Sequence, residues 1–355
     1  MSDSLTIVLL LKDRIEYTKR WMTYMNDIYC PYKILIADGG KDKSIESDLT
    51  SNKNYQNLNF EYIRYPYDES LEDFWKKYHD VMSRVESKYF IQANNDDFFI
   101  LDRVSELLKM LEENSDVMGA RGGHADFTVY DYRSSKINNI KGSRYTAISR
   151  SSPSIEMDSS IERIDFFCRN ISQFDFYSNW YCVFRTDAIC EIWDRLITLS
   201  INNPIVIEML MHIFILEKGK IKIFNFPYYL RQNGTSQLGD RLVADNDFLE
   251  RCIIDGALSE FSLSINTYLN HYKEDQRTEI VKSIAQWLQD FIVNVSLNNN
   301  RHHNSWFYRL SIIIRRTAFF GIFTERLYAF VFNLSSKQVE RKVIKIKEIE
   351  NYIIK

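Results

Sequence analysis

Strand-like and helix-like patterns alternate along the first part of the chain. Four segments have the apolar or alternating pattern of strands: 5–11, 32–40, 59–65 and 88–93. Three segments carry apolar side chains at helical spacing: 14–29, 71–87 and 103–113. Strand, helix and strand repeated at this spacing predict βαβ units and an α/β fold, with a mixed, mainly parallel sheet flanked by helices.

The pattern becomes less regular after residue 115. A strand is expected within "VMGARGGHADFTVYDY", and the Ser-rich segment 143–160 is typical of a mobile loop. Segment 176–196 predicts a strand that runs into a helix capped near Thr186 or Asp187, and 204–220 predicts an apolar helix ending at Gly219. A strand and a polar loop follow. From about residue 240 the pattern is helical, so we divide the chain into 1–240 and a helical C-terminal region, 241–355.

Polar residues and glycines follow three of the predicted strands. They are Lys12-Asp13-Arg14, Asp38-Gly39-Gly40 and Asn94-Asn95-Asp96-Asp97. Parallel strands bring their carboxyl ends to one edge of a sheet, where ligands bind in such folds. Buried carboxylates cost several kcal/mol unless they are paired or bind a cation. The acids between "KYFIQA" and "FFI" therefore lie either in a surface turn or at a cation site.

Composition excludes several classes of protein. A net charge of -3 and a pI near 6.1 in 355 residues give no electrostatic case for nucleic acid as the main partner. The five cysteines are odd in number and form no C-x-x-C, which favours a reducing cytoplasm over a disulfide framework or a zinc cage. We find no signal peptide, and no apolar window approaches the ~20 residues of a spanning helix.

An ordered set of short motifs resembles the GT-A fold glycosyltransferases, close to family 2. The matching strings are "TIVLLLKDR", "PYKILIADGG", "KYFIQANNDDFF", "FYSNWYCVFRTD", "IEMLMHIFILEKGKIKIF" and "YYLRQNGTSQ". The resemblance covers roughly residues 5–240 and implies that residues 1–240 form a nucleotide-sugar-binding catalytic domain with a Rossmann-like sheet. It implies transfer of a sugar from a nucleotide-diphosphate donor, such as a UDP- or GDP-sugar, to a hydroxyl of a glycan or lipid-linked acceptor. The implied setting is bacterial surface polysaccharide synthesis, with inversion and with Mn²⁺ or Mg²⁺.

The resemblance also implies roles for the residues at the sheet edge. Asp97 takes the place of the family's metal-binding Asp, and Asn95 stands where the family often has another Asp, so that its carbonyl oxygen becomes a metal ligand. A hard cation there neutralises the leaving diphosphate. The expected donor-binding residues are Asp13, Arg14, Asp38, Gly39, Asn95, Asp96 and Arg231. The alternatives are a helix-cap role for Asp97, a turn role for Asp38, and a helix start at Asp13 and Arg14.

Glu208 matches the region that supplies the catalytic base in inverting relatives. Its neighbours are apolar, and burial would raise the pKa of a carboxyl there. The alternative is a half-exposed or ion-paired helix Glu. His124 and Asp126 are the reserve candidates for acceptor binding or for the base. Gln232 or Asn233 stands where relatives often carry a His.

The C-terminal region leaves more than one interpretation open. Residues 305–333 interleave aromatic residues with arginines, which is typical either of a peripheral membrane contact or of a helical subdomain that packs on the catalytic domain or on a second subunit of a homo-oligomer. The expected location is the cytoplasm, including the inner face of its membrane. The rival functions are a non-catalytic protein that binds sugar nucleotide or glycan, and a nucleotidyltransferase, which "LLLKDRIEY" disfavours because it lacks a glycine-rich loop.

Overall fold

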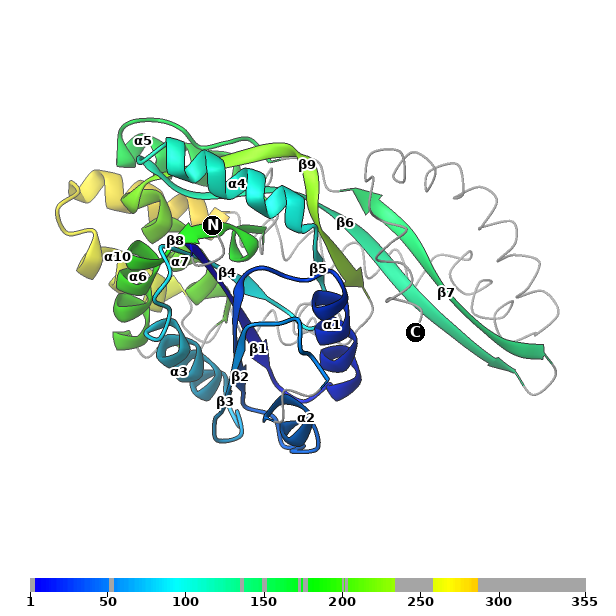
Figure 1. Cartoon of the computed structure of the whole chain (residues 1–355). Coiled ribbons are helices and arrows are strands. Elements are labelled where there is room, and N and C mark those ends of the chain that lie inside the picture. The colour runs from blue at the N-terminus through cyan, green and yellow to red at the C-terminus, as the bar shows by residue number, and fades with distance from the viewer. Residues whose placement is uncertain are drawn as a thin grey trace, which may run out of the picture.

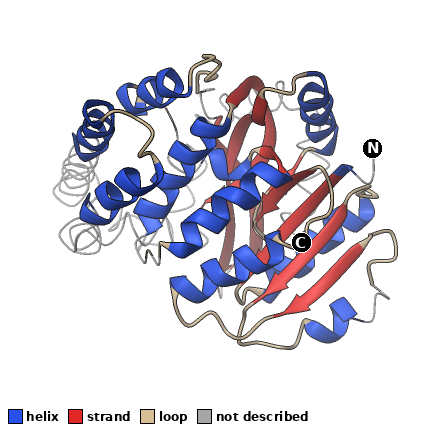
Figure 2. Ribbon diagram, turned by 90° about the vertical axis from the view of Figure 1, so that its left-hand side faces the viewer, coloured by secondary structure: helices blue, strands red, loops and turns tan. Residues whose placement is uncertain are grey.

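The structure is a computed structural model, and it describes residues 4–50, 54–134, 137–148, 152–171, 174, 178–199, 201, 204–233 and 258–286. The described strands form one mixed sheet with helices packed against it (Figures 1 and 2). The strand order is β3-β2-β1-β4-β8-β6-β9-β5, and β7 pairs with β6 outside this path. The predicted α/β fold with a mixed sheet is confirmed.

The first half of the sheet is parallel. Its strands are β1 (Leu5–Leu11), β2 (Lys33–Asp38), β3 (Phe60–Arg64) and β4 (Tyr89–Ala93). Every side chain of β1 and β4 is buried, as their continuous apolar runs require. The intervening helices are α1 (Ile15–Asp27), α2 (Glu46–Thr50) and α3 (Leu71–Met82). A capping box between Ser70 and Asp73 fixes the start of α3.

The second half of the sheet mixes directions. Its strands are β5 (Phe98–Phe99), β6 (Val117–Ser134), β7 (Ile137–Ile148), β8 (Val183–Arg185) and β9 (Lys220–Asn233). β6 runs parallel to β9 and antiparallel to β7 and β8. Further helices are α4 (Leu101–Glu113), α5 (Ser160–Arg169), η3 (Ser178–Tyr181), α6 (Thr186–Thr198), α7 (Pro204–Lys218) and α10 (Leu258–Tyr268), and residues 274–286 are helical as well.

The strand order places a switch point between β1 and β4. The chain proceeds from β1 through β2 to β3 on one side, and then returns to the other side of β1 for β4. The loops that leave β1 and β4 at their carboxyl ends therefore diverge from one another. Open α/β sheets bind ligands in the crevice at such a point.

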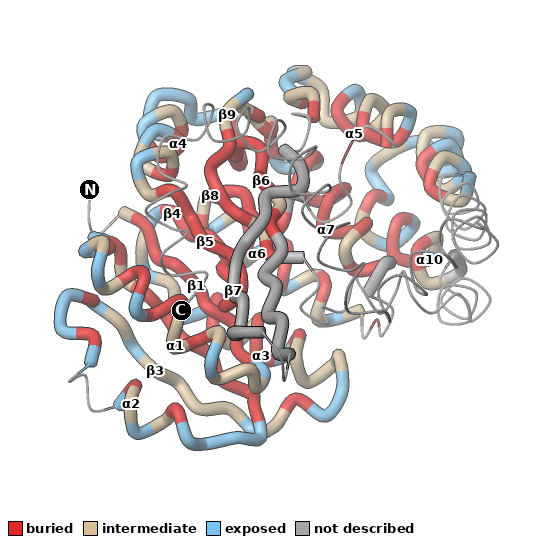
Figure 3. The backbone as a smooth tube through the Cα atoms, turned by 90° about the vertical axis from the view of Figure 1, so that its right-hand side faces the viewer, coloured by how far each residue is buried: buried red, intermediate tan, exposed pale blue. Residues whose placement is uncertain are grey.

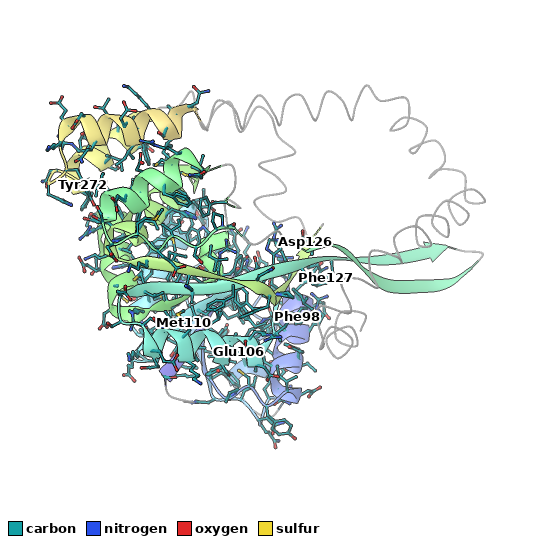
Figure 4. All side chains as sticks on the ribbon, turned by 90° about the horizontal axis from the view of Figure 1, so that it is seen from above. Phe98, Glu106, Met110, Asp126, Phe127 and Tyr272 are labelled. Carbon is teal, nitrogen blue, oxygen red and sulfur yellow. The ribbon has the colours of Figure 1, made fainter. Side chains whose placement is uncertain are left out.

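The prediction of a loop over 143–160 is wrong for residues 143–148, which belong to β7. β7 extends to Ile148, and β6 and β7 form a long antiparallel pair that projects from the rest of the described structure (Figures 1 and 4). The backbone of this Ser-rich segment forms a ladder with β6, and polar composition does not exclude such pairing. The start of α6 also differs by one residue, because its N-cap is Arg185.

Aromatic side chains join α3, η3 and α6 beside the sheet. Trp75 stacks on Trp180 with ring centroids 5.8 Å apart, and both pack against Trp193 and Tyr78. The adjoining strands are buried along most of their length (Figure 3). This packing holds η3, and with it Tyr181, close to the end of β4.

Several predictions concern residues that the structure does not describe. The boundary near residue 240 and the segment 305–333 both lie outside the described ranges. α10 lies beyond that boundary and is helical as predicted. In the part of the chain that the structure describes, every helix is too short or too polar to span a bilayer.

Candidate functional site

Two adjacent carboxylates lie buried where β4 ends. Asp96 is 1% exposed and Asp97 is 2% exposed. The two phenylalanines that follow form β5, which is fixed by pairing with Tyr229 and Leu230 of β9. The apolar residues on both sides of the acids are thus strand residues, and the acids occupy the short connection between them. They are not in a surface turn.

Asp97 has one oxygen with a partner and one without. The Gln232 backbone N–H donates to Oδ1 at 2.9 Å. Oδ2 is buried and has no partner in hydrogen-bond geometry among the described residues, and the nearby Tyr181 hydroxyl lowers the pKa of this carboxyl. Burial, and then the charge of Asp96, raise the pKa of Asp97 well above its ordinary value. A hard cation fits this buried, unshared oxygen. The N-cap of α4 is Ile100, so Asp97 is not a helix cap.

Asp96 and Asn95 face α1. Arg14 Nη2 donates to Asp96 Oδ2 at 2.9 Å. The Asn95 side-chain amide donates to Thr18 Oγ1 at 3.0 Å and to the Arg14 carbonyl at 3.4 Å. The connection after β4 is therefore joined to the loop after β1 directly across the switch point.

The loop after β1 has an unusual backbone. Asp13 and Arg14 have φ values of 60° and 65°, in the left-handed region that residues other than Gly rarely adopt. Asp13 Oδ1 accepts hydrogen bonds from the N–H groups of Lys41 at 2.6 Å and Asp42 at 3.3 Å, beyond β2. Arg14, which is the N-cap of α1, does not cap the helix with its side chain. Strain of this kind clusters at functional sites.

A hollow of about 630 Å³ opens between the loops after β1 and β2. Its walls are Asp13, Arg14, Ile15, Glu16, Tyr17, Lys19, Lys41, Asp42 and Ser44. It adjoins the two carboxylates, because Arg14 both lines it and pairs with Asp96. A space of this size suits a small polar ligand.

Asp38 ends β2 beside this hollow. It is 2% exposed; its Oδ2 accepts from the Tyr62 hydroxyl at 2.8 Å and from Arg64 Nη1 at 2.7 Å, and its Oδ1 accepts from the Gly40 N–H at 2.8 Å. The Arg64 guanidinium also donates to the Gly40 carbonyl. Asp38 therefore stabilises the Gly39-Gly40 turn, which is the alternative role that the sequence left open. It also lies at the carboxyl edge of the parallel strands, as predicted.

A buried ion pair beneath these loops was not predicted. Lys77 of α3 pairs with Asp68, with both side chains 1% exposed, and Lys77 Nζ also donates to the Leu11 carbonyl at 2.8 Å. Lys12 Nζ donates to the Asp68 carbonyl at 2.5 Å. Burial is the largest cause that lowers the pKa of Lys77 and raises that of Asp68. The sequence signal was a lysine within the apolar stripe of α3.

The reserve candidates lie on the β6–β9 side of the same centre. Asp126 lies next to Phe127, whose ring centroid is 6.2 Å from that of Phe98 (Figure 4). Its Oδ1 is 3.5 Å from His124 Nε2 and 4.0 Å from Arg231 Nη1, and the charge of Arg231 acts on Asp97. Burial, and then Arg231 and Arg121, lower the pKa of His124 to about 3. The imidazole is neutral at physiological pH and is a weak base.

Glu208 lies in α7, as predicted. Burial raises its pKa to about 8, and its Oε2 is buried with no hydrogen-bond partner among the described residues. Its backbone carbonyl contacts His212 Nδ1 at 2.5 Å. Among the residues described, no hydrogen bond or ion pair joins Glu208 to Asp96 or Asp97. The ion-paired alternative does not hold in this part of the chain.

The structure thus brings most predicted residues to one centre. Arg14, Asn95, Asp96, Asp97 and Arg231 are linked by contacts or charge across β1, β4 and β9. Gln232, the stand-in for the family's His, joins this centre through its N–H and through its side chain, which accepts from Arg20 at 2.6 Å. In the described ranges, no group of three or more His, Cys, Asp and Glu side chains is arranged to hold a metal.

Comparison with known proteins gives matches among solved structures only. No family model and no curated protein matches the sequence. The structure of residues 1–349 of S. aureus TarS is similar at 11% identity and a TM-score of 0.47, covering 84% of this chain and 73% of that chain. The same region of TarS in complex with UDP-GlcNAc gives 10% identity, a TM-score of 0.48, and coverage of 78% and 70%.

A synthetase of another kind is also similar. CMP:2-keto-3-deoxy-manno-octonic acid synthetase complexed with CTP gives 13% identity and a TM-score of 0.35, covering 64% of this chain and 91% of that chain. At these identities and TM-scores the likeness carries no argument about activity. The case for a function rests on the residues of this chain.

Proposed function

We propose that the chain is a glycosyltransferase that uses a nucleotide-diphosphate sugar, with Mg²⁺ or Mn²⁺ held at Asp97. The observation that carries the proposal is the buried, unpartnered Oδ2 of Asp97 at the switch point, next to a hollow of about 630 Å³. When bound, the cation would neutralise charge on the leaving diphosphate. Asp97 would hold it, with Asn95 as the second predicted ligand.

The nucleotide would occupy the hollow between the loops after β1 and β2. Asp13 ties these loops together, and Asp38 accepts from the Gly40 N–H where the loop after β2 begins. Arg14 and Arg231 lie near the carboxylates and carry the positive charge that a diphosphate needs. The acceptor would be a hydroxyl of a glycan or lipid-linked molecule, in bacterial surface polysaccharide synthesis.

Glu208 would be the general base of an inverting reaction. Its raised pKa keeps it protonated below about pH 8, so the transfer rate should increase with pH toward that value. Glu208→Gln removes the proton acceptor and should lower kcat by about 10²–10⁴-fold. If Glu208→Gln keeps the wild-type rate, Asp126 becomes the candidate base.

The decisive experiment is donor turnover by the purified chain. UDP- and GDP-sugars are incubated with and without Mn²⁺, and release of nucleoside diphosphate is measured for the wild type and for Asp97→Asn. Cation-dependent release that the variant lacks supports the proposal. The absence of release with every donor, together with nucleotide binding by calorimetry, would instead support the non-catalytic binding protein.

One observation favours that second candidate. Asp96 is paired with Arg14 through its Oδ2, and the Asn95 amide donates to α1, so within the described residues Asp97 is the acid of this motif that forms no ion pair. A protein that binds sugar nucleotide without turning it over would need no stronger cation site.

A further inference from the structure

The geometry points to a second role for Arg14. We infer that its ion pair with Asp96 withholds one of the two adjacent carboxylates, so that a divalent cation binds this centre only together with a diphosphate. The inference rests on the cation site proposed at Asp97, and it deepens that proposal by assigning a residue that makes cation binding depend on the nucleotide.

The pair is placed where it would oppose a lone cation. Arg14 Nη2 is 2.9 Å from Asp96 Oδ2, and the Asp96 side chain is 1% exposed. Asp96 is also the direct neighbour of Asp97 in the chain, and both side chains are buried. A cation that used both carboxylates would have to displace the guanidinium or lie beside it. Both are unfavourable in a buried site.

Asp97 alone offers little to a hard cation. Its Oδ1 already accepts from the Gln232 N–H, which leaves the buried Oδ2. Mg²⁺ and similar ions take about six oxygen ligands and are commonly bound by one or two carboxylates together with substrate phosphates. A bound diphosphate would supply the missing oxygen ligands. Without a diphosphate, water or other protein groups would have to supply them.

The backbone holds Arg14 in this position. Its left-handed φ of 65° places it at the start of α1, and its carbonyl accepts from the N–H groups of Tyr17 and Thr18 and from the Asn95 amide. Its guanidinium also lies over the Tyr17 ring, 4.4 Å from the centroid. Its side chain keeps 30% exposure. A diphosphate can therefore reach the guanidinium and compete with Asp96 for it.

The test is binding of Mn²⁺, measured by the loss of the free-ion electron paramagnetic resonance signal. Wild type, Arg14→Gln and Arg14→Lys are titrated with Mn²⁺ alone and with Mn²⁺ plus UDP or GDP. Arg20→Gln is the matched control, because Arg20 also feels the charges of Asp96 and Asp97 but donates to Gln232. Circular dichroism and thermal unfolding verify that each variant is folded.

The expected result separates the variants. Mn²⁺ alone should bind weakly to wild type, Arg14→Lys and Arg20→Gln, and about tenfold or more tightly to Arg14→Gln, which frees the second carboxylate. Asp96→Asn in the Arg14→Gln background should remove the gain. If Arg14→Gln misfolds, Arg14→Met with Mn²⁺ present during refolding gives the same comparison.

Two results would overturn the inference. One is a folded Arg14→Gln that binds Mn²⁺ alone no more tightly than wild type does. The other is an equal gain in Mn²⁺ affinity for Arg20→Gln. That result would indicate that any loss of nearby positive charge strengthens Mn²⁺ binding, and that the Arg14–Asp96 pair has no specific effect. Failure of the proposed function is distinguishable, because it would appear as no enhancement by UDP or GDP in any protein, whatever Mn²⁺ alone does.

Discussion

Replacing Glu208 with Gln should change how the stability of the protein depends on pH. Burial raises the pKa of Glu208 from 4.5 to about 8. Between these values the unfolded chain loses this proton while the native state keeps it. The native state therefore binds more protons, and the free energy of unfolding falls as pH rises from about 4.5 to about 8. Below this window both states are protonated, and above it both are ionised.

The magnitude follows from the size of the shift. Each pKa unit corresponds to about 1.36 kcal/mol, so a shift from 4.5 to about 8 gives on the order of 5 kcal/mol. This is an upper value, because the Glu208 side chain as a whole is only partly buried, although its Oε2 is fully covered. It is still a large part of the roughly 5–15 kcal/mol that stabilises a typical domain. Glu208→Gln removes the ionisable group and should be the more stable protein at pH 8.

The assay is urea unfolding of wild type and Glu208→Gln at several pH values from 5 to 9. The difference in unfolding free energy should be small at pH 5 and should grow toward pH 8 in favour of the variant. Glu86→Gln, at an exposed position, is the control and should keep a constant difference. A constant difference for Glu208→Gln, or a variant that is less stable at pH 8, would refute the assignment of a buried, unpaired carboxyl.

The remaining predictions concern the sheet edge. Asp97→Asn should stay folded, because it removes repulsion with Asp96, and should lose Mn²⁺-dependent nucleotide binding in calorimetry; an unchanged heat would contradict the cation site. Gly39→Ala should lower the melting temperature, because its Cβ would clash with the Asp68 carboxylate. An unaltered melting curve would show that Asp68 can move. Lys77→Met should destabilise the protein by about 3–5 kcal/mol in urea unfolding, because it leaves the buried Asp68 without its ion-pair partner. Adding Asp68→Asn to this variant should recover part of the lost stability, and no recovery would argue against the ion pair.

The sequence by itself determined the parallel half of the sheet and the edge where polar residues gather. β1, β2 and β4 lie within the segments that their apolar runs predicted, because a strand buried on both faces must be largely apolar. β3, at the edge of the sheet and only partly buried, lies within the segment that its alternating pattern predicted. Chain order then places the loops after these strands at one edge. The acids between β4 and β5 were identifiable for the same reason, since carboxylates rarely lie between buried apolar runs without a partner or a ligand.

Only the tertiary structure decided which of these charged residues form ion pairs with one another. The Arg14–Asp96 pair joins residues 82 positions apart, and the Lys77–Asp68 pair depends on α3 packing beneath the loops after β1 and β2. The extension of β7 depends on hydrogen bonds to β6, which composition does not encode. Periodicity reports which face of an element is buried. The three-dimensional arrangement determines which buried charges meet, and at this site it decides that Asp96, and not Asp97, is paired with Arg14.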